Sequence, residues 1–308
     1  MKKRILSLAL SALLVIPFAA ACGNGDTDTT SADGTTTAGG TQTEQPAGNF
    51  DTSQTINVVT REDGSGTRGA FVEIVGVEDA DGNDAIYAEA VVQNGTNAVL
   101  STVAGDTYGI GYISISSLNE TVKAVKVNGT EPTTEAINDG SYPISRPFNI
   151  AYQDGSLSEV AQDFVNFIMS AEGQAVVGDN SLIAADDGAP AYAPAGVTGD
   201  VVVGGSTSVT PVMEALAEEY MALNDGSFIE IQSTGSTAGM TGAIDGNVEI
   251  GMASRELSDE EAAVLKNQAI GIDGIAVIVH NENTITDLSL DQVKSIYLGE
   301  TTTWSEVE

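Results

Sequence analysis

Residues 56–71 read INVVTREDGSGTRGAF: an apolar β-branched run, a turn rich in glycine and hydroxyl side chains, and a second apolar segment. The run Ile56–Thr60 predicts a buried strand, and Thr67–Val75 predicts a helix. The loop Gly64–Gly69 therefore opens a helix, where free backbone N–H groups and the helix dipole favour a bound anion. Its glycines let the backbone approach such a ligand closely.

The same strand–loop–helix pattern occurs twice more along the chain. Gly204–Ser208 follows the apolar run Val201–Val203, and Gly235–Gly239 follows Phe228–Gln232. A single loop of this kind is as often an ordinary turn as an anion site, because glycine and serine also make turns. Three loops in the same context indicate one shared anion site.

Arginine side chains gather beside these loops in a chain that is otherwise acidic. Acidic residues outnumber basic ones by 44 to 11, and residues 2–4 hold three of the eleven. Arg61 and Arg68 flank the first loop, and Arg255 follows another predicted strand, whereas Arg146 reads as structural. Arginine forms forked hydrogen bonds with tetrahedral oxyanions. The alternative, pairing with neighbouring acidic residues, is compatible with anion binding because such acids would orient the arginines.

The first 49 residues predict export and tethering. A basic start, the 17-residue apolar run Ile5–Ala21 and small residues before Cys22 predict a signal peptide over 1–22. The pattern before Cys22 resembles a lipoprotein processing site, so we expect Cys22 to be lipidated. An uncleaved membrane anchor is the alternative, but the run is short for a span of about 20 residues. Residues 23–49 have no aliphatic side chain larger than alanine and predict a disordered tether.

Strands and helices alternate over the rest of the chain, which predicts an α/β fold with largely parallel sheets. The segment Ala184–Asp200 is rich in Ala, Pro, Gly and Asp and predicts a linker. Further predicted strands are Gly109–Ser114, Val122–Val127, Val248–Gly251 and Ile275–Val279; further helices are Asn97–Val103, Ser158–Met169, Pro211–Leu223, Ser258–Asn267 and Leu290–Tyr297.

Composition excludes several function classes. One cysteine allows neither a disulfide framework nor a cysteine-clustered zinc site, and a formal charge of −33 disfavours nucleic acid. The single histidine, His280, reads as a surface residue. The sequence has no carboxylate-rich metal motif and no Gly-x-Ser-x-Gly elbow, so we expect no catalytic residues, no metal and no cofactor. A secreted phosphatase and a surface sensor remain the alternatives from other classes.

Taken together, eight segments resemble the phosphate-binding lipoproteins of Gram-positive ABC phosphate importers. They are Arg61–Phe71, Gly109–Ser114, Tyr142–Phe148, Gly205–Pro211, Gly235–Gly239, Gly251–Leu257, Asp273–Val279 and Trp304–Glu306. The resemblance implies a two-lobed periplasmic-binding-protein-like fold of type II with a hinge and an interlobe cleft. It also implies a monomer on the extracytoplasmic face of the cell membrane, anchored by lipid, that delivers inorganic phosphate to an ABC permease.

The order of these segments differs from the family, in which the Gly205 segment begins the mature domain. The sequence therefore looks circularly permuted, with the linker 184–200 joining the family's usual ends. On this interpretation residues 50–118 and 279–308 form one lobe, and residues 119–278 form the other. Phe50 and Glu308 should then be neighbours.

The resemblance also implies the ligand contacts. Ser254 stands where well-known members have an aspartate that accepts the proton of bound phosphate, which leaves sulfate, molybdate or a phosphonate as alternative ligands. The residues that we expect to contact phosphate are Arg61, Ser65, Gly66, Thr67, Thr207, Ser208, Ser236, Ser254 and Arg255.

Overall fold

Two large hydrophobic cores and a smaller third one, between Ala151 and Leu265, organise residues 50–307, the part of the chain that this computed structural model describes. The first core takes its buried side chains from residues 56–144 and 275–307, and the second from residues 148–270. We call residues 50–144 with 275–307 lobe 1, and residues 145–274 lobe 2. The predicted signal peptide, lipidated Cys22 and tether, together with Glu308, lie outside the described residues.

The cores divide the chain at different residues from those predicted for the lobes. Residues 122–144, which we expected in the second lobe, pack into the first core. The reason is strand pairing: β4 (Lys123–Ala124) pairs with the end of β11 (Lys266–Val279), and β5 (Lys126–Val127) pairs with β12 (Asp287–Leu288). Both partner segments contribute side chains to the first core.

Lobe 1 is built on parallel strands that carry helices. β1 (Asn57–Arg61) lies between β2 (Val91–Gln93) and β3 (Gly109–Ser114) and is parallel to both. Three aromatic side chains fix the packing of α1 (Gly66–Val75) and α9 (Leu290–Tyr297) on this sheet. The ring of Phe71 stacks on Tyr112 at 4.0 Å and meets Tyr297 edge-on at 4.7 Å. Other elements of this lobe are α2 (Thr96–Ala104), η1 (Ile115–Ser117), α3 (Thr134–Asn138) and η2 (Trp304–Glu306).

Lobe 2 repeats the arrangement with its own parallel strands. β8 (Gly199–Gly205) lies between β9 (Ser227–Ser233) and β10 (Ile250–Ala253) and is parallel to both. α4 (Glu159–Ile168) buries one face because its apolar residues recur at helical spacing. The other helices of this lobe are α5 (Ala171–Asp179), α6 (Thr210–Leu223), α7 (Ser236–Asp245) and α8 (Asp259–Ala262).

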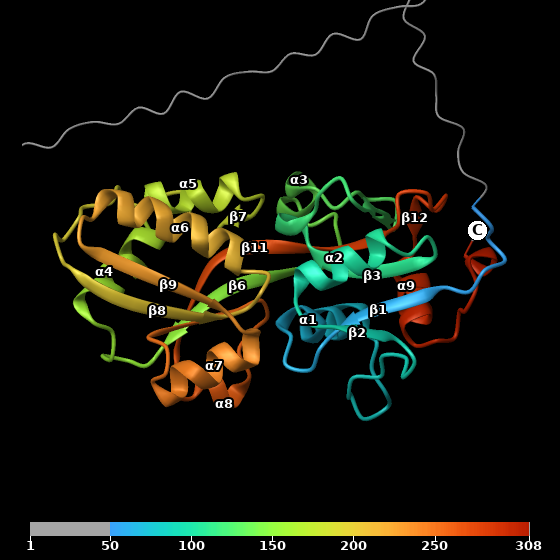
Figure 1. Ribbon diagram of the computed structural model, residues 1–308, viewed down its shortest axis with the longest axis horizontal. Coiled ribbons are helices and arrows are strands. Elements are labelled where there is room, and N and C mark those ends of the chain that lie inside the picture. Colours follow the sequence, from blue (N-terminus) through green and yellow to red (C-terminus); the bar gives the residue numbers. More distant parts are fainter. Residues whose placement is uncertain (1–49, 308) are drawn as a thin grey trace, which may run out of the picture. The chain divides into compact units, whose positions relative to one another are not determined.

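Two antiparallel strands join the lobes. β11 pairs with β3 through residues 275–279 and with β6 (Ser145–Tyr152) through residues 266–274, while β6 pairs with β10. Figure 1 shows β11 and β6 running between the two groups of parallel strands. The sheet is therefore mixed, whereas the alternation of elements predicted largely parallel strands.

One predicted helix, Ser258–Asn267, is mostly wrong. Its capping box is present, with Ser258 and Glu261 bonded to each other's backbone, but the helix ends at Ala262. Lys266 already belongs to β11, because pairing with β6 outweighs the local helical signal. The predicted linker is closer to expectation: between β7 (Ile183–Ala184) and the start of β8 at Gly199, the chain forms neither helix nor strand.

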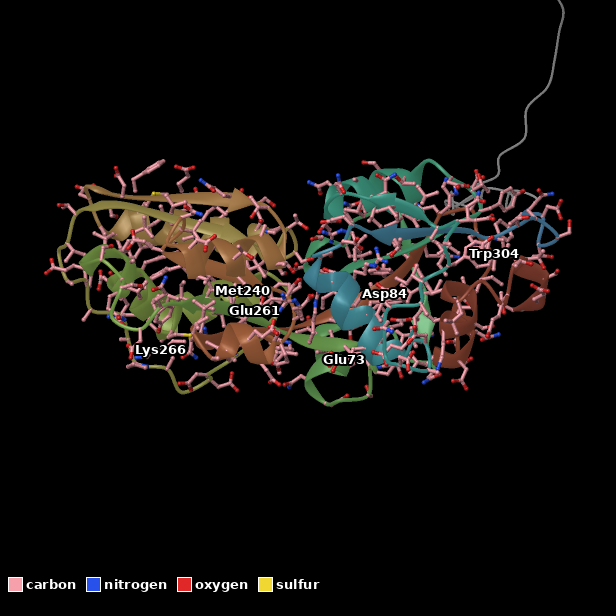
Figure 2. All side chains as sticks on the ribbon, turned by 90° about the horizontal axis from the view of Figure 1, so that it is seen from below. Glu73, Asp84, Met240, Glu261, Lys266 and Trp304 are labelled. Atoms are coloured by element: carbon pink, nitrogen blue, oxygen red, sulfur yellow. The ribbon has the colours of Figure 1, made fainter. Side chains whose placement is uncertain are left out.

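The two ends of the described chain lie together on lobe 1. The rings of Phe50 and Trp304 are 5.9 Å apart, and the amide of Ser305 donates to the carbonyl of Thr52 at 2.7 Å. Figure 2 places Trp304 among the side chains of lobe 1. Within residues 50–307, no helix has the length and apolar character needed to cross a membrane.

Candidate functional site

The loop between β1 and α1 begins the site. Gly64 has a φ of +80°, a conformation that favours glycine, and turns the chain after the strand. The hydroxyl of Ser65 then caps α1 by accepting from the amide of Arg68 at 3.3 Å. The first amides of α1, at Gly66 and Thr67, have no partner within the helix and are free to bind a ligand.

The second and third loops come from lobe 2. At Gly205, a Cβ would lie 2.8 Å from the amide nitrogen of Met252, so only glycine lets β8 and β10 lie this close. The turn that follows carries Ser206, Thr207 and Ser208 to the start of α6. Gly235, with a φ of +97°, precedes Ser236, the first residue of α7.

The three loops meet between the lobes. The hydroxyls of Thr67 and Ser208 are 2.9 Å apart, although the residues are 141 positions apart in the chain. The amide of Thr237 donates to the carbonyl of Gly64 at 3.1 Å. The structure thus brings together the loops that the sequence singled out.

Hydroxyl groups from both lobes form a connected cluster at this meeting point. The hydroxyl of Ser206 donates to that of Ser254 at 2.8 Å, and the amide of Ser254 donates to the hydroxyl of Ser236 at 3.2 Å. Gly66 faces these groups, because a Cβ there would overlap the hydroxyl of Ser236 and lie 2.8 Å from that of Ser254. We define the hydroxyl cluster as Thr67, Thr96, Ser206, Thr207, Ser208, Ser236 and Ser254, all buried except the half-buried Thr207.

Sequence reasoning missed two members of this cluster, Thr96 and Ser206. The hydroxyl of Thr96 lies 3.2 Å from that of Thr207 and 3.4 Å from that of Ser208. Thr96 begins α2 after Gly95, whose φ is +86°. The signal was present, since a glycine–hydroxyl pair again follows an apolar run, but β2 is only three residues long.

Arg61 supplies a buried positive charge at one end of the cluster. Its guanidinium donates twice to Glu62, at 2.8 Å each, and once to the hydroxyl of Thr207 at 3.0 Å. Burial raises the pKa of Glu62, but the hydrogen bond and the charge of Arg61 together lower it by more. The pKa of Glu62 therefore lies below its ordinary value. Glu62 is therefore ionised at neutral pH and fixes the orientation of Arg61.

The other arginines near the loops have different partners. Arg255 forms two bonds with Glu261, at 2.7 and 2.8 Å, and a longer one with the hydroxyl of Thr237. Its contacts place it at the rim of the site. Arg68 pairs with Asp84 at 2.6 Å and with the exposed Asp63 at 3.1 Å. Arg146, which read as structural, forms a buried ion pair with Asp273.

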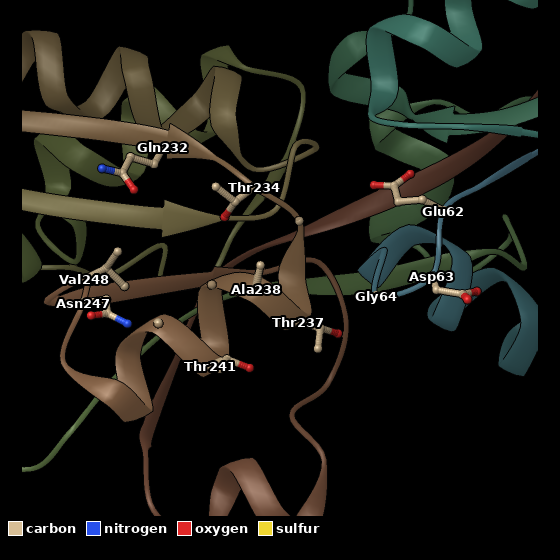
Figure 3. A pocket seen from close by; sticks show the side chains of 13 residues that line it. Glu62, Asp63, Gly64, Gln232, Thr234, Thr237, Ala238, Thr241, Asn247 and Val248 are labelled. Atoms are coloured by element: carbon tan, nitrogen blue, oxygen red, sulfur yellow. The ribbon is translucent and has the colours of Figure 1, made fainter.

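A pocket of about 540 Å³ opens beside the cluster. Figure 3 shows Glu62, Asp63 and Gly64 of lobe 1 on one side, and Thr237 and Thr241 of α7 on the other. Gln232 and Asn247 add amide groups to its lining. The pocket is lined by the first and third loops, at Gly64 and Gly235.

The arrangement suits reversible binding of a small oxyanion. Hydroxyls and helix N-terminal amides converge from both lobes, and a guanidinium held by a carboxylate lies at their edge. Within residues 50–307, no group of three His, Cys, Asp or Glu side chains is placed to hold a metal ion. His280, whose Nδ1 accepts from the amide of Glu282, is engaged in a turn of its own.

Comparisons with known proteins identify the family of the chain. A PBP superfamily domain matches residues 29–172 and 190–308. The chain is 47% identical to the phosphate-binding protein PstS 2 of Streptococcus agalactiae serotype V, over 82% of this chain and 88% of that protein. The crystal structure of a phosphate-binding protein of a phosphate ABC transporter from Streptococcus pneumoniae is 44% identical, with a TM-score of 0.67, and the match covers 82% of this chain and all of that one.

A third relative matches over a much shorter stretch. The phosphate-binding protein PstS of Bacillus subtilis is 28% identical over 113 residues, which is 36% of this chain and 38% of that protein. The long matches decide the classification. The chain belongs to the PBP superfamily and, within it, to the family of the phosphate-binding proteins PstS.

Proposed function

We propose that this protein captures inorganic phosphate outside the cell membrane and delivers it to an ABC permease. The observation that carries the proposal is the buried hydroxyl cluster, which joins both lobes and ends at Arg61. Membership of the PstS family supports phosphate as the ligand. The protein then acts by binding alone and is not an enzyme.

Each part of the site has a defined task in this proposal. Arg61 provides charge-assisted hydrogen bonds, and Glu62 keeps its guanidinium in place. The amides that open α1 and α7 add donors along the helix axes. Hydroxyls rotate to donate to phosphate oxygens or to accept from a phosphate O–H. The contacting residues that we propose are Arg61, Ser65, Gly66, Thr67, Thr207, Ser208, Ser236, Ser254 and Arg255.

Ligand binding and lobe closure are coupled, because the donors come from both lobes. A phosphate ion that bonds Thr67 and Ser208 at once stabilises the closed arrangement over an open one. β6 and β11 are the strands between the cores, so we propose that they form the hinge. The lobe boundaries then lie near residues 145 and 274.

We propose that the chain is a circular permutation of the more common PstS order. Three observations support this. Lobe 1 is assembled from both ends of the described chain. Phe50 and Trp304 are in contact. The match to the Bacillus subtilis protein covers little more than a third of either chain, as expected when an alignment must stop at a reordered junction. The long streptococcal matches indicate that those proteins share the order seen here.

We propose that the protein is a monomer and that lipidation at Cys22 holds it at the outer face of the membrane. The leader sequence and the single cysteine support the lipidation. A Cys22→Ala variant should be released into the medium or remain unprocessed, which fractionation and mass spectrometry would detect. Unchanged membrane association and processing would remove this part of the proposal.

Isothermal titration of the tether-free protein tests the ligand. We expect one phosphate per chain with micromolar or tighter affinity, and much weaker binding of sulfate and molybdate. The comparison between anions matters because Ser254 offers a hydroxyl, which can donate to sulfate as well as accept from phosphate. Tighter binding of sulfate or molybdate would assign the site to another oxyanion, and no heat with any of them would contradict the proposed function.

A further inference from the structure

A buried ion pair joins the two strands that run between the lobes. Arg146 on β6 lies directly opposite Asp273 on β11, and its guanidinium donates to that carboxylate at 2.9 and 3.1 Å. The side chains of Arg146 and Asp273 are 1% and 0% exposed. Ile144 and Ile275, beside them, belong to the first core, whereas Phe148 and Ile270 belong to the second, so the pair lies between the cores.

The pair makes one further contact with each lobe. Asp273 accepts a hydrogen bond from the hydroxyl of Ser114, at the end of β3 in lobe 1, at 2.7 Å. Arg146 donates to the carbonyl of Ser254, just after β10 in lobe 2, at 2.9 Å. Ser254 belongs to the hydroxyl cluster. A change in the position of Arg146 therefore reaches the proposed ligand site through one hydrogen bond.

The charge of Arg146 interacts with that of Arg61. Burial lowers the pKa of Arg146, Asp273 raises it, and the positive charge of Arg61 lowers it again. The two guanidinium groups thus repel each other. Arg61 bonds Thr207 at one end of the hydroxyl cluster, and Arg146 bonds Ser254 at another. An anion held by the cluster attracts both charges and offsets their repulsion.

Stability alone is a weak explanation for the pair. Buried ion pairs often contribute no more stability than apolar side chains of similar volume, because both charges lose their hydration. Burial raises the pKa of Asp273 as well as lowering that of Arg146, so each charged form depends on the other. A charged pair at this position is better explained by what it does for the neighbouring site.

We propose that Arg146 and Asp273 are positioning residues for the anion: the pair holds Ser254 in place, with the guanidinium on the side of the hydroxyl cluster. The inference rests on the proposed function. Asp273 orients Arg146 and links it to lobe 1 through Ser114. Binding affinity, lobe closure and the geometry of Ser254 then depend on one ion pair.

The test compares phosphate affinity with stability in a double variant, Arg146→Met with Asp273→Leu. We expect it to stay folded with a modest loss of unfolding free energy in urea without phosphate, because two apolar groups replace the charges while Ser114 and Ser254 each lose a hydrogen-bond partner. Its dissociation constant for phosphate, measured by isothermal titration, should rise about tenfold or more. A stably folded double variant with wild-type affinity would overturn the inference.

Two further variants complete the experiment. Arg146→Lys keeps the charge but loses the forked geometry, so we expect an affinity between those of the wild type and the double variant. This variant decides the matter if the double variant fails to fold, since wild-type affinity in Arg146→Lys would also overturn the inference. The control, Lys266→Gln with Asp154→Asn, removes an exposed ion pair of β11 and should leave affinity unchanged. Failure of the wild type to bind phosphate would instead contradict the proposed function.

Discussion

Gly66 is surrounded by the hydroxyls of two serines, so the site has no room for a side chain at this position. In Gly66→Ala, the added methyl group would occupy space that we assign to the ligand and would displace Ser236. We expect phosphate affinity to fall by about a hundredfold or more, measured by isothermal titration. Gly69→Ala is the matched control on the same helix, because its Cβ would make only a 3.7 Å contact with Arg255. Equal affinities in the two variants would place the ligand elsewhere.

Substitution of Arg61 tests the charged part of the site. Charge-assisted hydrogen bonds contribute roughly 1.5–3 kcal/mol, so Arg61→Ala should weaken phosphate binding by about ten- to a hundredfold. The single variant also leaves Glu62 unpaired beside the anion, which adds repulsion. We therefore expect Arg61→Ala with Glu62→Gln to recover part of the loss. Wild-type affinity in Arg61→Ala would remove this residue from the site.

The stabilisation by the Arg61–Glu62 ion pair depends on pH through Glu62. Its pKa in the folded protein is below the ordinary value of 4.5, so the stabilisation is present above that value and is lost as pH falls through the lowered pKa. We expect Glu62→Gln to reduce the unfolding free energy by about 1–3 kcal/mol near neutral pH and by less near pH ~3. Urea denaturation across this range measures the difference. A difference that stays constant with pH would contradict the ionised pair.

The N-terminus of α2 belongs to the site, although the sequence predicts neither an anion-binding loop nor a ligand residue there. Thr96→Val keeps the shape of the side chain but removes the hydroxyl that bonds Thr207 and Ser208. We expect phosphate affinity to fall about three- to tenfold. Thr102→Val is the control on the same helix, since that hydroxyl bonds the carbonyl of Ala98 away from the cluster. Equal effects of the two substitutions would mean that α2 acts through its stability alone.

Sequence patterns predicted most elements that lie next to the site, and the exceptions have physical causes. The strand–loop–helix units of β1–α1, β8–α6 and β9–α7 carry strong local signals, so their loops were predictable. The sequence predicts no strand at β6, because Pro147 interrupts its apolar pattern, and the capping signal at Ser258 predicts a helix where β11 begins. Both strands owe their form to pairing with each other, which no local pattern reports.

The same distinction holds for the ligand residues. Thr67, Ser208 and Ser236 stand in loops whose composition marks them, and the structure brings these loops together. Arg146 reaches the cluster from the opposite strand through the carbonyl of Ser254, so only tertiary structure relates it to the site. The role of Arg255 stays a prediction, because its guanidinium bonds Glu261 in this structure.

For the whole molecule, the contact between the two ends of the described chain predicts that the chain can be reopened elsewhere. A permuted protein would start at Gly188, join residue 308 to Phe50 through a short glycine–serine linker, and end at Asp187. Both residues at the new ends are exposed and lie outside helices and strands. We expect this protein to fold and to bind phosphate within about threefold of the wild-type affinity.

The control for that experiment opens the chain at Gly271 instead. This break falls inside β11, within its pairing with β6, and should abolish both cooperative unfolding and binding. If the protein opened at Gly188 also fails to fold, the chain ends cannot be moved into the linker 184–200, and the permutation proposal loses its support.

A crystal structure of the phosphate complex would show whether the hydroxyl cluster between the lobes holds the anion. We expect one phosphate within hydrogen-bond distance of Thr67, Ser208 and Ser236, with the Arg61 guanidinium bonded to one of its oxygens. Arg146 should remain paired with Asp273 beneath Ser254. A phosphate bound away from the cluster, or a cluster without phosphate at saturating concentration, would contradict this assignment of the ligand site.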